Sequence, residues 1–281
     1  MSYRTSRHTF DTALFVKHCV LVVAALLVLL PAYFMLVTAF KSQAGYSLNK
    51  SNFPEPLFTG NFTTALRGGR FFLWFANSII LTLGSVFLSI VVSTLAAFAF
   101  ARMRFASRNI ILATNTALMV IPPVVMLIPL FLFLASIRLI STYTGAILVY
   151  AGLVTPFSIY LLTNFFRTIP HEIIESALID GASSLDVLIR ILLPLSGPAL
   201  VTLIVVNSLW VWNDLLIALV LLPQDNLRSL MVGITVFGSR YNNDVPVAMA
   251  GMLLASIPMV ALYIFGQKYF IRGLVAGAVK G

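Results

Sequence analysis

A polar cluster interrupts one of the longest apolar stretches of the sequence, in the segment NSLWVWND at residues 207–214. Asp214 is the one acid within these stretches, and a charged group at membrane depth is costly unless it faces a cavity or a partner. Helical spacing places Asn207, Trp210 and Asp214 on one face, and Asn213 adjoins them. An indole beside amide and carboxylate groups could stack on a sugar ring and hydrogen-bond its hydroxyls. These four residues are candidates for a substrate pathway; the alternative is a polar clamp between helices.

A second set of chemically suggestive residues lies in the polar stretch 167–198, between two apolar stretches. Four of the nine acidic residues of the chain fall within it, at Glu172, Glu175, Asp180 and Asp186. A polar loop of this length between membrane spans either reconnects two helices or offers a surface to a partner in the aqueous phase. The pattern inside the loop favours the second interpretation.

That pattern predicts a helix, a glycine turn and a second helix. Pro170 suits the first turn of a helix. Apolar side chains then recur along one face of that helix, at Ile173, Ile174, Ala177 and Leu178. Gly181 can adopt the left-handed cap that ends this helix, and Ser183 with Asp186 forms a variant of the capping box for the next one. Small side chains would let a partner approach the backbone of the turn closely; they are Ala177, Gly181 and Ala182.

The residue types exclude several kinds of chemistry. No lysine follows a glycine, so the chain has no Walker A phosphate cradle. The three histidines, His8, His18 and His171, lie outside the predicted spans, which argues against an intramembrane protease or metal centre. A single cysteine, Cys19, allows neither an internal disulfide nor a thiolate metal site. Lysine and arginine are not clustered densely enough for nucleic-acid binding.

Composition identifies the kind of protein in which these residues must be positioned. Of the residues, 60% are hydrophobic and only 10% are charged, with a mean hydropathy of +1.00. Soluble domains carry about 25% charged residues, so the chain is expected to be an all-α membrane protein. A span needs about 20 apolar residues, and six stretches qualify, at about 19–40, 77–101, 109–134, 144–166, 199–222 and 247–267.

The distribution of lysine and arginine predicts the orientation. An even number of spans puts both termini on one side, and short basic loops such as RMRFASR at residues 102–108 tend to stay in the cytoplasm. We therefore expect a cytoplasmic segment at 1–18, a transmembrane domain at 19–267 and a cytoplasmic tail at 268–281. The loop at 167–198 then also faces the cytoplasm.

Two of the predicted spans have unusual sequences. The second has hydroxyls at helical spacing, which favours close helix packing or else forms a polar wall of a pathway; they are Ser78, Thr82, Ser85, Ser89 and Ser93. The third contains Pro122, Pro123 and Pro129, so its helix should be kinked or partly unwound. That break suits either a lined pathway or a bent packing helix.

The loop sequence ESALIDGASSLDVLIRILLPLSGPAL resembles the EAA loop of permease subunits of bacterial ATP-binding-cassette (ABC) importers. That signature runs E-A-A, three residues, G, nine residues and I-x-L-P, with Ser176 here replacing one alanine. Further stretches resemble the second permease subunit of maltose-type carbohydrate systems: NSIILTLGSVFLSIVVSTLAAFAFARMRF, IPPVVMLIPLFLFLASIRLISTYTGAILVY, VWNDLLIALV and YFIRGLVAGAVKG. The likeness extends from the first span to the end of the sequence.

The resemblance implies a type I importer permease fold with six transmembrane helices and a cytoplasmic coupling helix, in the inner membrane of a bacterium. The implied partners are a second permease subunit, an ATPase dimer that uses ATP and Mg, an extracytoplasmic solute-binding protein facing the loop at 223–246, and a sugar or oligosaccharide. The implied ATPase-coupling residues are Glu175, Ala177, Asp180, Gly181, Ala182 and Pro194. An ion-coupled secondary transporter is the alternative, although Asp214 would be its one membrane carboxylate.

Overall fold

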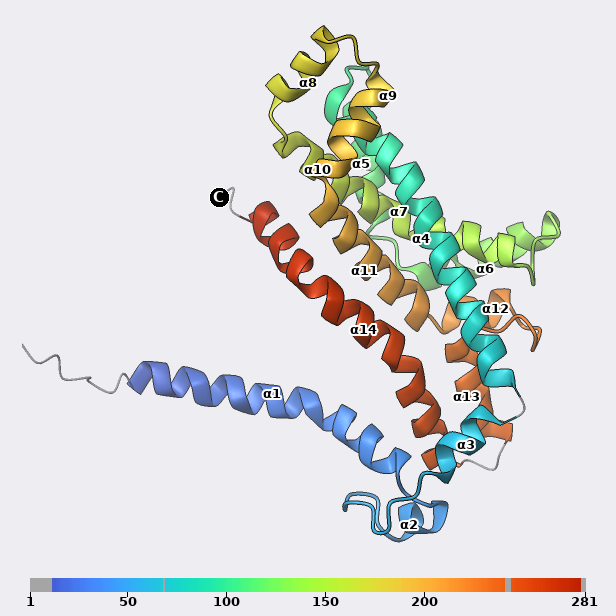
Figure 1. The fold of residues 1–281 in the computed structure, drawn as a ribbon. Coiled ribbons are helices and arrows are strands. Elements are labelled where there is room, and N and C mark those ends of the chain that lie inside the picture. Colours follow the sequence, from blue (N-terminus) through green and yellow to red (C-terminus); the bar gives the residue numbers. More distant parts are fainter. Residues whose placement is uncertain (1–11, 68, 241–243, 279–281) are drawn as a thin grey trace, which may run out of the picture.

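The computed structural model describes residues 12–67, 69–240 and 244–278, and within these residues the chain is helical and contains no strand. Four long helices build the body: α4 (Arg70–Arg102), α7 (Tyr143–Thr168), α11 (Gly197–Asn213) and α14 (Val245–Ala278). At one end of this body lie α8 (His171–Ile179) and α9 (Ser184–Asp186); at the opposite end lie α2 (Gln43–Leu48) and α3 (Gly60–Leu66) (Figure 1).

The hydroxyl-bearing face of α4 packs along α7. Ser85, Ser89 and Ser93 are fully buried inside this single chain, and small side chains allow two membrane helices to approach closely. The structure therefore supports the packing interpretation of this face over the pathway wall. We refer to this contact between α4 and α7 as the hydroxyl seam.

Four helices within the described residues are long and apolar enough to cross a membrane, namely Leu14–Ala39, Arg70–Arg102, Tyr143–Thr168 and Val245–Lys268. Two further pairs of helices meet the same test together but bend at a short break. By length and composition, the described residues thus hold four spans, or up to six if each bent pair is one span, and the bounds of the six expected spans stay a prediction. The assignment of 1–18 and 268–281 to separate cytoplasmic segments stays a prediction, and α14 continues as helix to Ala278.

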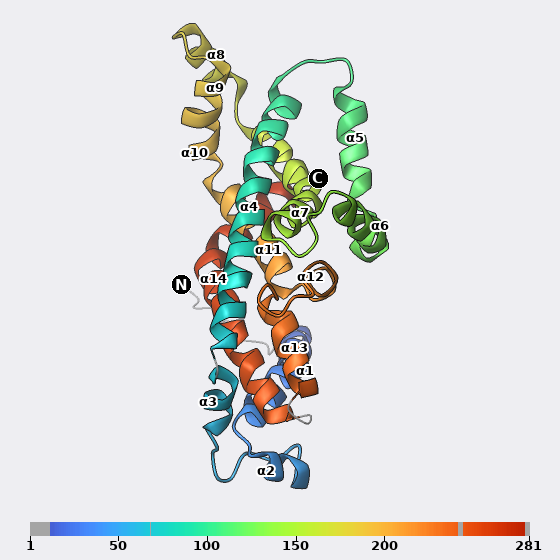
Figure 2. The same cartoon turned by 90° about the vertical axis from the view of Figure 1, so that its right-hand side faces the viewer.

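The third expected span, 109–134, is broken into α5 (Arg108–Leu118) and α6 (Pro123–Ser136), which meet at 102°. The break falls at Pro122 and Pro123, because a proline lacks the backbone N–H and disfavours helix at the residue before it. Pro129 is accommodated inside α6. Figure 2 shows α5 and α6 standing apart from α4, joined to it through the loop after Arg102.

The fifth expected span, 199–222, also divides. The helix α11 ends at Asn213, and the short helix α12 (Leu216–Leu221) follows in a new direction. Beyond it lies α13 (Leu230–Arg240). At its other end, α11 meets the preceding helical segment, Ser184–Leu195, at a bend of 75°.

The helix α1 (Thr12–Ala39) extends away from the body and contacts α14 near its C-terminal end (Figure 1). Of its most hydrophobic stretch, only 6% is buried inside this chain. It begins earlier than expected, so His18 is in the first turns of α1, where Nδ1 lies 2.7 Å from the carbonyl oxygen of Leu14. That His18 lies outside the membrane stays a prediction. His8 lies outside the described residues.

Candidate functional site

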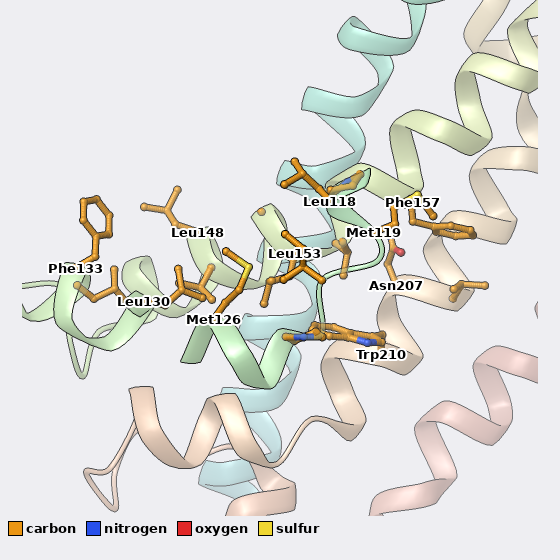
Figure 3. Close-up of a pocket in the computed structure, with 18 of the residues that line it drawn as sticks. Leu118, Met119, Met126, Leu130, Phe133, Leu148, Leu153, Phe157, Asn207 and Trp210 are labelled. Carbon is orange, nitrogen blue, oxygen red and sulfur yellow. The ribbon is translucent and has the colours of Figure 1, made fainter. Parts of the chain in front are cut away.

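A cavity of about 630 Å³ lies where the broken α5–α6 pair faces α7 and α11. Its walls are almost entirely apolar, and the two residues of the predicted substrate pathway that reach it are Asn207 and Trp210. Figure 3 shows these two side chains on α11, together with Met119 just after α5, Met126 on α6 and Leu153 on α7. The predicted pathway residues Asn213 and Asp214 are not part of the lining.

Trp210 is the large aromatic surface of the cavity. Its side chain is 37% exposed, and its ring meets the ring of Tyr150 edge-on, with centroids 6.2 Å apart and planes at 81°. An indole left partly open in a cavity can stack against an apolar face of a ligand. Trp210 therefore has the exposure that the predicted contact with a sugar ring requires.

Asp214 instead forms a clamp at the end of α11. One carboxylate oxygen, Oδ2, accepts a hydrogen bond from the Tyr150 hydroxyl at 2.7 Å and another from the backbone N–H of Ala218 at 3.0 Å. The first bond joins α11 to α7, and the second caps the start of α12. Of the two interpretations of Asp214, the geometry supports the polar clamp. Asn213 is exposed and donates to the carbonyl of Leu209 one turn earlier.

Asn207 belongs to a buried hydrogen-bond network as well as to the cavity wall. Its Nδ2 donates to the hydroxyl of Ser158 at 2.9 Å, and Ser158 in turn accepts from Ser89 at 3.3 Å. Thr155 donates to the hydroxyl of Ser89 at 3.1 Å. These side chains link α4, α7 and α11 and satisfy one another at membrane depth, where an unpaired polar group is costly.

The second candidate region is residues 171–195, which we call the elbow. It consists of α8, a turn, α9, the π-helix η1 (Val187–Leu192) and α10 (Leu193–Leu195). Its apolar side chains divide into two groups. Those packed against Phe166 and Leu203 in the body are Ile174, Val187, Leu188 and Leu192. Those left exposed are Ile173, Leu178, Ile179, Leu185, Ile189 and Leu195.

This division corrects the expected apolar stripe of α8. Ile173 and Leu178 were expected to pack beside Ile174, but only Ile174 is buried, while the side chain of Ile179 is 86% exposed. Isolated exposed apolar residues are common, but a group of them at the end of an elbow marks an interaction surface. The elbow thus has one face fixed to the body and one face available.

The turn of the elbow has the predicted geometry. Gly181 adopts φ +85°, and a Cβ at this position would meet no atom of the chain within 4 Å. Ser183 and Asp186 form a complete capping box, with the side chain of each bonded to the backbone N–H of the other. The Ser183 hydroxyl and the Ser183 backbone N–H both donate to the Asp186 carboxylate and lower its pKa, with a smaller contribution from Arg190, whose Nε lies 3.2 Å from Oδ1. Glu175 and Asp180 are exposed beside this turn.

The elbow joins α11 through a wide helical turn. The six residues of η1 have π-helical geometry, in which each N–H bonds five residues back, and such turns occur often at functional sites. Pro194 lies in the short helix α10 that follows and is exposed. Ser196 marks the bend, and its hydroxyl donates to the carbonyl of Leu192 at 2.7 Å.

Sequence reasoning missed the residue that fixes the other end of the elbow, Arg102. Its guanidinium donates to the carbonyl oxygens of Phe166 and Ile169, the latter at 2.6 Å. These groups lie at the C-terminus of α7, where helical carbonyls lack partners and a cation is favourable. Arg102 was noticed only as part of a basic loop, and nothing in the sequence pairs it with positions more than sixty residues away.

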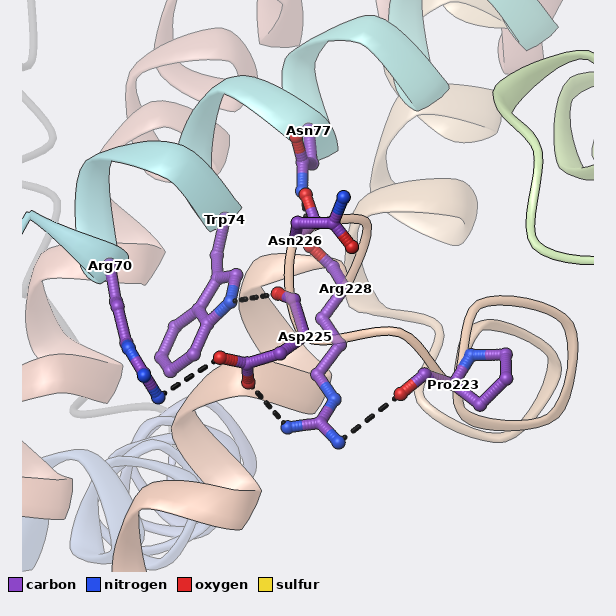
Figure 4. Close-up of polar contacts among 7 residues, drawn as sticks. All are labelled: Arg70, Trp74, Asn77, Pro223, Asp225, Asn226 and Arg228. Carbon is purple, nitrogen blue, oxygen red and sulfur yellow. Dashed lines mark hydrogen bonds and ion pairs between the residues drawn. The ribbon is translucent and has the colours of Figure 1, made fainter.

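A third polar cluster holds the loop after α12 against the start of α4 (Figure 4). Asn77 donates to the carbonyls of Asn226 and Arg228, both at 2.9 Å. Asp225 pairs with Arg70 at 2.9 Å and with Arg228 at 2.7 Å. We call residues 223–229 the clamped loop. These residues form the first part of the segment 223–246, which was predicted to face the solute-binding protein. Residues 241–243 of that segment lie outside the described residues.

No group of three or more histidine, cysteine, aspartate or glutamate side chains is placed to hold a metal ion in the described part of the chain.

Comparison with known families decides the class of protein. Residues 89–275 match the family described as the binding-protein-dependent transport system inner membrane component. This chain belongs to that family. It is therefore a multi-pass inner-membrane permease subunit of an ABC importer, a transport component and not an enzyme. The match includes the elbow, α11 and the cavity.

Individual relatives of the permease span nearly its whole length. It is 43% identical over 252 residues to a putative ABC transporter permease protein of Caldicellulosiruptor, covering 89% of this chain and 91% of the relative. It is 32% identical to the melibiose/raffinose/stachyose import permease protein MelC of Bacillus subtilis, covering 90% and 91%. It is 31% identical to the arabinooligosaccharides transport system permease protein AraQ of the same organism, covering 92% of each.

The fold of the permease also has a solved counterpart. A chain of a bacterial ABC transporter involved in the import of the polysaccharide alginate superimposes with a TM-score of 0.81 at 24% identity, covering 95% of the permease and 100% of that chain. This match confirms the expected importer permease fold.

Proposed function

We propose that this permease forms half of the translocation pathway for a sugar or oligosaccharide. Its proposed partners are a second permease subunit, an ATPase dimer that hydrolyses ATP with Mg, and an extracytoplasmic solute-binding protein. The names of similar permeases support a saccharide substrate, since MelC is named for melibiose, raffinose and stachyose and AraQ for arabinooligosaccharides. Family membership also favours this function over an ion-coupled secondary transporter.

The observation that carries the proposal is the two-faced elbow. One face is packed on the body through Ile174, Leu188 and Leu192, while the other presents exposed apolar and acidic side chains around the turn at Gly181. A rigid element of this kind can transmit the closure of a partner ATPase to α11 and the cavity. In this proposal the elbow and both termini face the cytoplasm, and the coupling residues are Glu175, Ala177, Asp180, Gly181, Ala182 and Pro194.

The cavity beside α11 is proposed to be the part of the pathway that this subunit contributes. Trp210 supplies an aromatic face and Asn207 an amide edge, the combination that suits the mixed apolar and hydroxyl surface of a sugar. Movement of rigid helical units on either side of such a midplane site is the general basis of alternating access. Asp214 contributes indirectly, through its hydrogen bonds.

The clamped loop is proposed to face the solute-binding protein. It lies at the far end of the body from the elbow, near α13 (Figure 1), so the two partners would act on opposite sides of the membrane. Hydrogen bonds from Asn77 and Trp74 hold its backbone. A loop fixed in this way can bind a partner without first losing conformational entropy.

The test of the proposed ATPase contact is Gly181→Trp in the complete complex, with Leu48→Trp as the control. Both positions are open in this chain: Gly181 has no atom nearby, and Leu48 on α2 is 88% exposed. We expect Gly181→Trp to insert in the membrane normally but to lose co-purification of the ATPase and ATP-driven uptake. Leu48→Trp should keep the ATPase. Normal uptake by the Gly181→Trp complex would overturn the docking role of the elbow.

A further inference from the structure

Tyr150 is a buried polar residue to which neither the sequence motifs nor the family match assigns a role. It lies in the middle of α7, its side chain is only 1% exposed, and its hydroxyl donates to Asp214 Oδ2 at 2.7 Å. Its ring edge also meets the indole of Trp210. Tyr150 thus contacts Trp210 on α11 and Asp214 at the end of α11, four positions later. It does not line the cavity itself.

These two contacts constrain the orientation of Trp210. Asp214 lies one helical turn after Trp210, so anchoring Asp214 fixes the last turn of α11 and the backbone that carries the indole. The same carboxylate oxygen accepts from Ala218 at the start of α12. The bond from Tyr150 therefore also fixes the direction in which the chain leaves the cavity after Asn213.

We propose that Tyr150 is a positioning residue for the transported sugar, which acts by holding Trp210 through the Asp214 bond at the junction of α11 and α12. This inference rests on the proposed function of the cavity. The hydroxyl does not meet the sugar; it sets the angle at which the indole face is presented. Loss of the hydroxyl should therefore impair transfer of sugar through the cavity while leaving the partner surfaces intact.

The test is Tyr150→Phe in the reconstituted complex with its ATPase, second permease and solute-binding protein. Radiolabelled raffinose, maltotriose and arabinotriose are first compared in the wild-type complex, and the sugar that is transported fastest is chosen. Uptake of this sugar is then measured at saturating loaded binding protein. The decisive quantity is sugar transported per ATP hydrolysed. We expect this ratio to fall roughly three- to tenfold, the effect of one hydrogen bond, while stimulated ATP hydrolysis stays within about twofold. A purely structural defect would lower both rates in proportion.

Three companion variants complete the test. Asp214→Asn keeps an acceptor for Tyr150 and should retain the wild-type ratio of sugar transported per ATP hydrolysed. Asp214→Leu removes the acceptor and should lower this ratio as Tyr150→Phe does. It therefore provides the same test if the Tyr150→Phe complex assembles poorly. Tyr143→Phe is the matched control, because it removes another hydroxyl bond of α7, to Asn77 at 2.6 Å, away from the cavity. It should keep the wild-type ratio.

Trp210→Ala separates this inference from the proposed function. It should lower the ratio, and the double variant with Tyr150→Phe should be no worse, because Tyr150 acts through Trp210. A wild-type ratio in Trp210→Ala would overturn the pathway role of the cavity. A reduced ratio in Trp210→Ala with a wild-type ratio in Tyr150→Phe would overturn only the role of Tyr150, as would a double variant worse than Trp210→Ala alone.

Discussion

Arg102, at the end of α4, donates a hydrogen bond from its guanidinium to the backbone carbonyl of Ile169 at 2.6 Å, two residues before the elbow begins. The same nitrogen also contacts the carbonyl of Phe166. One side chain therefore ties the C-terminal end of α4 to the segment through which, in the proposed function, the ATPase acts. Through this connection, a force on the elbow can be transmitted directly to α4 and α7, the two helices of the hydroxyl seam.

The first prediction concerns this connection. Arg102→Met keeps the length of the side chain but leaves the Ile169 carbonyl without this donor, which costs about 1–3 kcal/mol for a buried group, while the Phe166 carbonyl keeps the backbone N–H of Ile169. We expect a lower melting temperature of the purified complex and weaker stimulation of ATP hydrolysis by loaded binding protein. Arg104→Met, in the same loop but exposed, is the control and should behave as wild type. Equal effects of the two variants would mean that only the charge of the loop matters.

The second prediction separates the two kinds of contact in the clamped loop. Asn77 is 1% exposed and donates to two backbone carbonyls, so Asn77→Ala should destabilise the loop by about 1–3 kcal/mol. Arg70, whose side chain is 51% exposed in its ion pair with Asp225, should matter less, because exposed pairs contribute about 0–1 kcal/mol. Protease accessibility of the loop and affinity for loaded binding protein should follow this order. The reverse order would show that charge, rather than buried hydrogen bonding, holds the loop.

The third prediction concerns pH. Hydrogen bonds from Ser183 lower the pKa of Asp186 in the folded elbow. A depressed pKa stabilises the fold above the unfolded value of about 3.9, and this contribution is lost as the pH falls through the lower folded value. Between pH 8 and pH 5 the capping box should therefore stay intact, as measured by hydrogen exchange in the elbow. Asp186→Asn should remove the pH response below this range; unprotected amides in wild type near pH 6 would contradict it.

The fourth prediction tests packing next to the clamped loop. A Cβ at Gly233 in α13 would overlap the ring of Trp74, which cannot move freely because its Nε1 donates to the carbonyl of Asp225. Gly233→Ala should therefore destabilise the complex by about 1–3 kcal/mol. Gly152 in α7 has no atom near its Cβ position, so Gly152→Ala should be neutral or slightly stabilising. Melting temperatures of the two variants provide the comparison, and an unchanged value for Gly233→Ala would show that α13 shifts to make room.

The sequence was sufficient for the features that depend on local patterns. Apolar length located the helices, Pro122 and Pro123 located the break between α5 and α6, and the Gly181 turn and the capping box at Ser183 appear as expected. Each of these features is decided within a few neighbouring residues. The family resemblance of the elbow was likewise read from one continuous segment.

Features that depend on distant pairs were not predicted. The division of α11 from α12 at Asp214 depends on a hydroxyl from α7, and the anchor of the elbow depends on Arg102 from α4. The exposure of Ile173 and Leu178 depends on which side of α8 meets the body. Periodicity gives the apolar face of a helix but not the angle at which that helix docks. A tyrosine in mid-span was the one local signal of a buried partner, since its hydroxyl needs an acceptor.

The hydroxyl seam has a consequence for what can drive the transporter. Its polar groups are neutral. Among the residues that the structure describes, Thr82 and Ser85 have no hydrogen-bond partner, whereas Ser89 is paired. A small slide of α4 along α7 could exchange one such partner for another without carrying charge across the membrane. Membrane voltage and proton concentration therefore do not act on this contact. The movement of α4 along α7 is governed by mechanical load alone.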